Sequence, residues 1–146
     1  MKFEIHAPCE QLRPYIKHLI VSESDETQSY KVLPGTSLVM GFQYAGRLAY
    51  LDNNLENPLA TAGITGLTDS YRVFKNTANT GSILVIFHET GAAHFFANPL
   101  NELFRQVYRS SICLVAMSWV IFQNSFPLPR MTGRGSGSSN NCSSII

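Results

Sequence analysis

Short apolar runs, most of them alternating with polar residues, recur along the first two thirds of the chain and are separated by turn-forming residues. Alternation is typical of half-buried β-strands, and no helical pattern long enough to form βαβ units lies between the runs. The pattern predicts a mainly β protein of the sandwich or barrel type. The predicted strands cover residues 16–23, 37–44, 47–51, 60–67, 70–74 and 82–88.

The connections between these strands carry recognisable turn chemistry. Ala45-Gly46 separates the second and third strands, which predicts a hairpin. The stretch 52–58 is dense in Asn, Asp and Pro, whose side chains favour turns, so we expect a loop there. In the first strand, alternation places Ile16, His18 and Ile20 on one face.

Two short helical pieces are expected to flank the sheet. Pro8 and Pro14 bracket a segment that is long enough for one helical turn. A second helical piece is predicted from Gly91 to Phe104, with Asn98 as a helix N-cap.

Residues 105–146 differ in composition from the preceding sequence. They contain no Asp, Glu, Lys or His, and a Gly/Ser-rich end follows an apolar block at 112–122. Two interpretations stay open: an out-of-frame translation product, or an apolar helix with a flexible tail. The apolar block is shorter than the roughly 20 residues that span a bilayer, so we expect no membrane insertion. We therefore divide the chain into a domain at 1–104 and an atypical tail at 105–146.

Charge and cysteine content bear on DNA binding and on cellular location. The ten acidic residues all lie between Glu4 and Glu102, and the seven Lys or Arg of residues 1–102 give that part of the chain a net charge of −3. Duplex DNA would repel this part, and the four arginines of the tail form no dense basic cluster. Three cysteines without paired spacing and a start without an apolar signal run indicate the cytoplasm.

No motif for catalysis or metal binding stands out. The four histidines are scattered, and His88 and His94 are six positions apart, a spacing that turns their side chains to different sides of a helix. We therefore predict no metal, no cofactor and no enzymatic activity. The alternative from a different class is a small metal-dependent cupin enzyme acting on a sugar or a keto acid.

The leading hypothesis for a functional site is a ligand pocket inside the β-structure. If Leu38, Met40 and Phe42 face inward, they form an apolar floor, and a polar side chain near it would orient the ligand. Ordinary packing is the competing interpretation for each residue, and a dimerisation module with a filled core remains open. The candidate ligand-binding residues are His18, Met40, Phe42, Tyr71 and His88.

Several short motifs, taken together over residues 8–103, resemble the N-terminal domain of AraC/XylS-type transcription regulators. They are Pro8…Leu12-Arg13-Pro14-Tyr15-Ile16-Lys17, Val32-Leu33-Pro34-Gly35, Gly63…Gly66 and Val85-Ile86-Phe87-His88…Gly91-Ala92…Phe95-Phe96…Pro99-Leu100-Asn101-Glu102-Leu103. The resemblance implies a partly open, cupin-like β-barrel that binds a small-molecule effector or mediates homodimerisation. Complete members bind DNA through two helix-turn-helix units that follow this domain. Because the sequence departs from the pattern after Leu103, we expect this polypeptide to lack that module.

Overall fold

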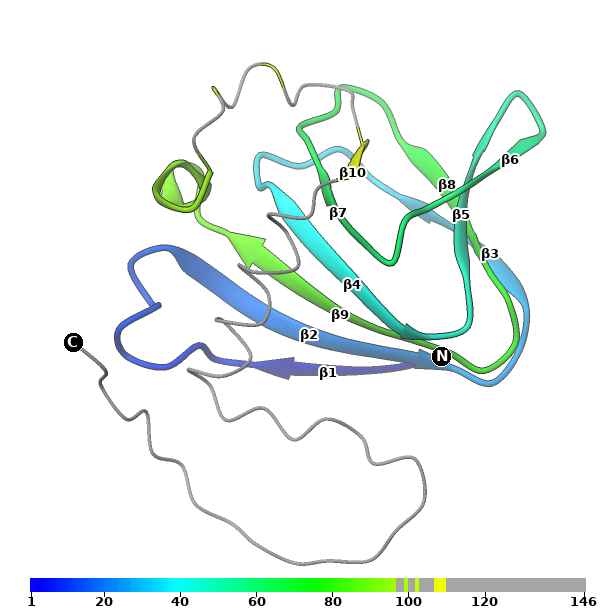
Figure 1. Cartoon of the computed structure of the whole chain (residues 1–146), viewed down its shortest axis with the longest axis horizontal. Helices are drawn as coiled ribbons and strands as arrows, with labels where there is room; N and C mark the ends of the chain where they lie inside the picture. The colour runs from blue at the N-terminus through cyan, green and yellow to red at the C-terminus, as the bar shows by residue number, and fades with distance from the viewer. Residues whose placement is uncertain (97–98, 100–101, 103–106, 110–146) are drawn as a thin grey trace, which may run out of the picture.

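The computed structural model describes residues 1–96, 99, 102 and 107–109, and it confirms a mainly β protein. The strands form two antiparallel sheets, one of six strands in the order β1-β2-β9-β4-β7-β10 and one of four in the order β3-β8-β5-β6 (Figure 1). The elements are β1 (Lys2–His6), β2 (Ile16–Ser24), β3 (Gln28–Val32), β4 (Val39–Ala45), β5 (Leu48–Asp52), β6 (Leu55–Pro58), β7 (Ala62–Thr65), β8 (Arg72–Asn76), β9 (Thr80–Phe87), the 3₁₀ helix η1 (Gly91–His94) and β10 (Val107–Arg109).

All six predicted strands are present, each shifted by a few residues at its ends. The strands β1, β3, β6 and β10 were not predicted from the sequence. Within the described residues the two sheets are open and do not close into a barrel, so the expected partly open, cupin-like barrel is not confirmed.

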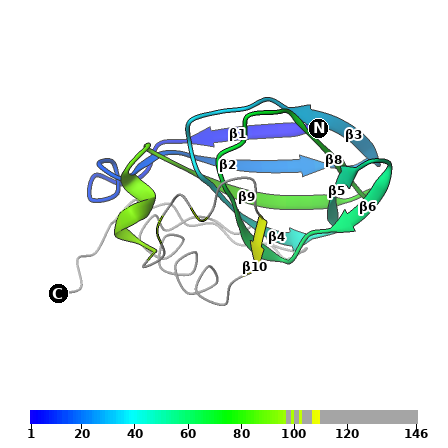
Figure 2. The same ribbon diagram turned by 90° about the horizontal axis from the view of Figure 1, so that it is seen from above.

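Six connections pass between the two sheets, and three of them lie together at one end of the molecule. The β2–β3, β4–β5 and β8–β9 connections all lie at the right-hand end of Figure 1, and Figure 2 shows the sheets meeting there. The β3–β4, β6–β7 and β7–β8 connections also cross between the two sheets.

The predicted hairpin between residues 37–44 and 47–51 is wrong. β4 pairs with β7 and β9 in the six-stranded sheet, whereas β5 pairs with β6 and β8 in the other sheet. A register shift between Gln43 and Ala45 disturbs the end of β4, and Gly46 follows with a φ of 65°. Such irregularities bend a strand and turn the chain, so the tight turn redirects it into the second sheet.

The segment expected to be a loop at 52–58 contains a hairpin instead. β5 and β6 pair from Ala49↔Pro58 to Asp52↔Leu55, and the two residues between them have φ values of 48° (Asn53) and 64° (Asn54). Positive φ at both central positions matches a type I′ turn, which Asn tolerates better than most residues. The Asn residues therefore signalled a tight turn between two strands and not an irregular loop.

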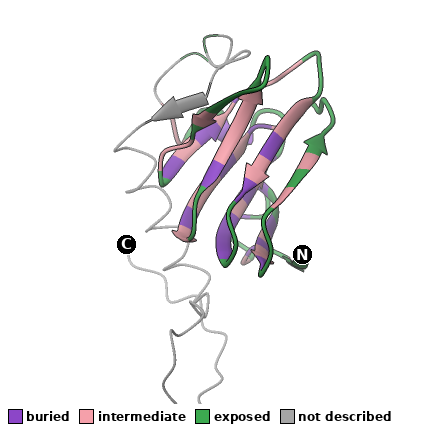
Figure 3. Cartoon of the chain, turned by 90° about the vertical axis from the view of Figure 1, so that its right-hand side faces the viewer, coloured by how far each residue is buried: buried purple, intermediate pink, exposed green. Residues whose placement is uncertain are grey.

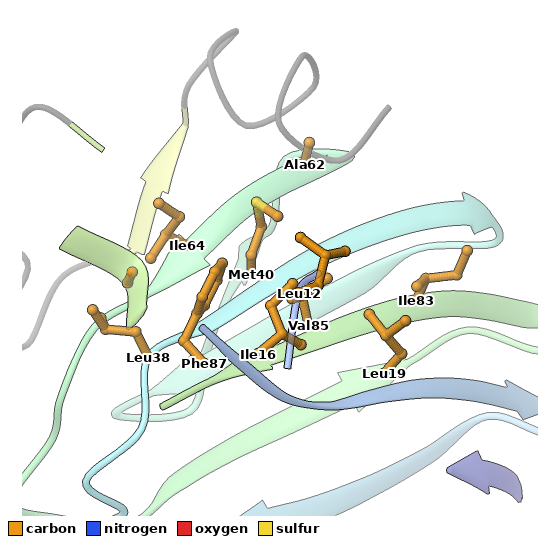
Figure 4. Packing of buried hydrophobic residues seen from close by; sticks show 11 residues of the cluster. Leu12, Ile16, Leu19, Leu38, Met40, Ala62, Ile64, Ile83, Val85 and Phe87 are labelled. Carbon is orange, nitrogen blue, oxygen red and sulfur yellow. The ribbon is translucent and has the colours of Figure 1, made fainter. Parts of the chain in front are cut away.

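The largest buried cluster lies on the face of the six-stranded sheet that points away from the other sheet. Figure 4 shows its side chains projecting from β2, β4, β7 and β9 and from the turn before β2, and Figure 3 shows buried positions alternating with less buried ones along the strands. The cluster consists of Leu12, Ile16, Leu19, Leu38, Met40, Ala62, Ile64, Ile83, Val85, Phe87 and Ala92.

A β-bulge corrects the predicted alternation of the first strand. The pairing of β2 with β9 shifts register between Ile16 and His18. Ile16 is consequently buried in the cluster with Leu19, while His18 is exposed. One extra residue in a strand moves the following side chains to the opposite face, which simple alternation does not anticipate.

Of the predicted helical pieces, the first is a hydrogen-bonded turn. The Cys9 carbonyl accepts from the Leu12 and Arg13 amides at 2.9 and 3.1 Å. The second begins at η1, and its expected N-cap, Asn98, lies outside the described residues, as does the apolar block at 112–122. No helix among the described residues is long and apolar enough to cross a membrane.

Asn76, the last residue of β8, joins this strand to the β2–β3 connection. Its buried side-chain amide donates to the Glu26 carbonyl, 50 residues away, and to the Thr77 carbonyl, both at 2.8 Å. Replacing it with Ala removes both hydrogen bonds, although the Glu26 carbonyl still accepts from Ser24 Oγ and the Thr77 carbonyl from Thr80 Oγ1. A net loss of about 1 kcal/mol for each bond gives an expected decrease in the free energy of unfolding of about 2 kcal/mol for Asn76→Ala.

Urea denaturation checks the Asn76 prediction. Asn57→Ala is the matched control, because the Asn57 amide makes a single exposed hydrogen bond within its own hairpin. Equal losses of unfolding free energy from the two variants would contradict the role of Asn76 in joining β8 to the β2–β3 connection.

Candidate functional site

A cavity of about 560 Å³ lies between the two sheets. All strands from β1 to β9 contribute residues to its lining, and the β6–β7 connection forms part of its wall. The lining consists of Phe3, Ser22, Tyr30, Lys31, Val32, Val39, Gly41, Phe42, Gln43, Leu48, Tyr50, Pro58, Leu59, Ala60, Gly63, Thr65, Phe74, Ser82, Leu84 and Ile86. This volume lies in the range of small-molecule sites, which are about 300–1,000 Å³.

Two glycines form part of the cavity floor, where they place no side chain. Gly41 on β4 and Gly63 on β7 are directly paired, and both belong to the lining. A Cβ atom built on Gly41 would lie 3.4 Å from Leu84 Cδ2 and near nothing closer. The backbone therefore accepts a side chain at this position, and the hollow exists because none is present.

An aromatic pair forms the opposite wall. Tyr30 on β3 is paired with Phe74 on β8, and their rings stack with centroids 6.0 Å apart and planes inclined by 24°. Burial raises the pKa of Tyr30, so its hydroxyl group stays protonated at neutral pH. Neither this hydroxyl nor that of Tyr50 hydrogen bonds to another residue in the described part of the chain, which leaves both available to a ligand.

Gln43 is the most buried polar residue of the lining after Ser82. Its side-chain amide joins β4 to two other parts of the cavity wall. Its Nε2 donates to the Ala60 carbonyl at 2.8 Å, and its Oε1 accepts from the Leu48 amide at 2.9 Å. Because both ends of the side-chain amide are occupied, Gln43 positions the start of β5 and the β6–β7 connection rather than offering a group to a ligand.

The charge of the lining is confined to one lysine. Lys31 lies at the exposed margin, with its Nζ 4.8 Å from the centre of the Tyr71 ring. The lining contains no Asp, Glu, His or Arg. The cavity consequently combines a mostly apolar interior, a few hydroxyl groups and one cation at its margin.

The five ligand-binding candidates predicted from the sequence do not meet in one place. Phe42 lines the cavity, but Met40 is fully buried in the cluster on the opposite face of the sheet, as is Leu38. His18 and His88 are exposed and outside the lining. Tyr71 is 55% exposed and reaches the cavity margin only through its contact with Lys31.

Most of the cavity residues were not identified from the sequence. Tyr30 lies in a strand that was not predicted, and Tyr50 lies in a strand that was predicted to pair with residues 37–44. A usable signal was present in the glycines, since an isolated glycine inside a strand pattern often marks a close approach or a hollow. Gly41 and Gly63 both fit that description.

Metal ligands do not converge in the part of the chain that the structure describes. No group of three or more His, Cys, Asp or Glu side chains there is arranged to hold a metal ion.

Comparison with known protein families places most of this chain in a family. The family model described as "Domain of unknown function (DUF6597)" matches residues 4–109, which include all strands from the start of β2 to β10 and most of β1. No curated protein and no solved structure matches the chain significantly.

Proposed function

Because the chain belongs to the family described as a domain of unknown function (DUF6597), we propose its function from the site itself: it is a regulatory domain that binds a small effector between its two sheets. The observation that carries the proposal is the mostly apolar cavity of about 560 Å³. We further propose that the domain is cupin-like and belongs to an AraC-type transcription regulator, on the strength of the sequence motifs at residues 8–103.

The lining favours an apolar or aromatic effector with few polar groups. Its interior supplies the Tyr30–Phe74 stack and aliphatic side chains, which reward the burial of a hydrocarbon or a ring. Tyr30 and Tyr50 provide hydroxyl groups that orient a polar atom. Lys31 at the margin suits a single anionic group, such as a carboxylate, that stays close to water.

Regulation requires that the effector bind two states of the protein with different affinity. The cavity is suited to this role because it is bounded by both sheets, so a ligand that fills it contacts both at once. In this proposal the domain works as a cytoplasmic homodimer, and DNA recognition belongs to a helix-turn-helix module that the described residues do not include.

Filling the cavity from its floor tests the proposal. Gly41→Leu places four carbon atoms in the hollow while its Cβ makes only an ordinary contact with Leu84. We expect affinity for the probe 1-anilinonaphthalene-8-sulfonate, an aromatic monoanion, to fall by at least about tenfold, while the thermal midpoint stays equal or rises. Fluorescence titration and thermal unfolding measure the two quantities.

The matched control is Met40→Leu, which changes the neighbouring residue of the same strand on the opposite face. A volume-conserving exchange costs less than about 1.5 kcal/mol and leaves the cavity unchanged, so probe affinity is expected to stay at the wild-type value. Unaltered binding by Gly41→Leu would remove the cavity as the binding site. Stoichiometric iron, manganese or zinc in the purified protein would instead support a metal-dependent enzyme.

A further inference from the structure

The edge strand β1 exposes an apolar face that the six-stranded sheet leaves uncovered. Among the described residues β1 pairs with β2 alone, so its other edge carries unpaired backbone groups. Phe3 and Ile5 are 56% and 67% exposed and share one face of the strand. Proteins usually protect such edges, because an exposed apolar edge pairs readily with another strand.

The other face of β1 carries a short alternation of charge. Lys2 and Glu4 lie on this face, with Lys2 Nζ 2.6 Å from Glu4 Oε1. This ion pair raises the pKa of Lys2 and lowers that of Glu4, so both groups are charged at neutral pH. A partner strand that pairs with β1 must therefore be apolar on one face. On its other face it must carry opposite charges at the positions that meet Lys2 and Glu4.

We propose that β1 is a homodimer interface, in which it pairs antiparallel with β1 of a second copy in a register centred on Phe3. In this register Phe3 lies opposite Phe3 of the second copy, and Lys2 lies opposite Glu4 on both sides of the two-fold axis. The strand is thus complementary to itself in both charge and apolar character. Two six-stranded sheets become one continuous sheet across the dimer.

Charge selects this register over its neighbour. A register centred on Glu4 would place the two Glu4 carboxylates opposite each other and set Lys2 opposite His6. Like charges directly opposite on paired strands are destabilising. The register centred on Phe3 contains two attractive pairs and no repulsive one.

Phe3 also belongs to the cavity lining, so it connects the interface with the effector site. The inference uses the homodimer of the proposed function and specifies its surface. It does not require that any ligand bind in the cavity. A single strand pair buries less area than the roughly 1,600 Å² of a standard interface, so we expect a dimer that dissociates on dilution.

Charge reversal tests the register without altering the cavity lining. We expect Lys2→Glu and Glu4→Lys each to raise the dimer dissociation constant by about tenfold, because each variant places like charges opposite each other. An equimolar mixture of the two variants is expected to recover the wild-type constant. In the mixed dimer the strand with two acidic side chains faces the strand with two lysines, so both cross-strand pairs are attractive again. Sedimentation equilibrium measures both variants and their mixture.

Crosslinking provides a second measurement that depends on distance alone. In a background with Cys9, Cys113 and Cys142 replaced by Ser, Phe3→Cys places two thiols at the two-fold axis, where opposite Cα atoms are about 4.5–5.5 Å apart. Ile5→Cys is the control, because its two copies would be roughly 13 Å apart. Mild oxidation is expected to yield disulfide dimers of the first variant only.

The outcomes separate this inference from the proposed function. A protein that stays monomeric at high micromolar concentration, a mixture that fails to recover, or equal crosslinking of the two cysteine variants would overturn the β1 interface. Probe binding by Lys2→Glu is measured alongside, and we expect it to match the wild type. Loss of the cavity site with an intact β1 dimer would reject the effector proposal alone.

Discussion

Gly91→Ala is expected to lower the free energy of unfolding by about 3 kcal/mol, because the added methyl group collides with backbone atoms. A Cβ on Gly91 would lie 2.0 Å from the Tyr15 carbonyl oxygen and 2.7 Å from the carbonyl carbon. That carbonyl cannot move freely, since it accepts the His88 amide at 2.9 Å beside the end of β9. The collision is therefore relieved only by separating η1 from the turn before β2.

Gly35→Ala is the control for Gly91→Ala. A Cβ at Gly35 meets nothing within 4 Å, so its effect is expected to stay within about 0.5 kcal/mol. Urea denaturation of both variants gives the comparison. A loss below about 1 kcal/mol for Gly91→Ala would mean that η1 does not hold this close contact with Tyr15 in solution.

Strand positions were largely predictable because they depend on local patterns. The runs at 16–23 and 82–88 became β2 and β9, which pair over most of their length at the centre of the larger sheet. Pairing partners were less predictable. A short turn such as Ala45-Gly46 serves a hairpin and a crossing between sheets equally well, and only long-range contacts decide between them.

The strands that were missed share weak local signals. β1 has exposed residues at four of its five positions, so burial did not impose a pronounced pattern on it. β6 lies in a polar segment whose composition suggested a loop, and its pairing depends on the turn at Asn53 and Asn54. In both cases the backbone hydrogen bonds of a neighbouring strand define the element more than its own side chains do.

The candidate site was less predictable than the fold for a physical reason. β4 and β9 are apolar on both faces, so alternation separates two faces without telling which one borders a cavity. Met40 and Phe42 were assigned to a single inward face, yet Met40 packs in the cluster while Phe42 also reaches the cavity lining. The absence of a side chain at Gly41 was a better indicator of a hollow than the presence of apolar ones.

Phe87→Ala is expected to have the largest effect of any single truncation in the buried cluster, a loss of about 3–5 kcal/mol. Phe87 is 0% exposed, and its ring lies 5.6 Å from that of Phe95 and 6.0 Å from that of Phe96. Truncation removes these contacts and leaves a cavity that the surrounding strands cannot close, because the Phe87 amide is held by the Leu38 carbonyl at 3.0 Å.

Phe3→Ala removes the same side chain from an exposed strand and serves as the chemical control. Phe3 is 56% exposed, so we expect its truncation to cost less than about 1 kcal/mol at protein concentrations where the chain is monomeric. The difference between the two variants then measures burial rather than the intrinsic effect of losing a phenyl ring. Similar losses from both would place the stabilising core on the cavity side of the sheet, where a ligand could not enter without displacing it.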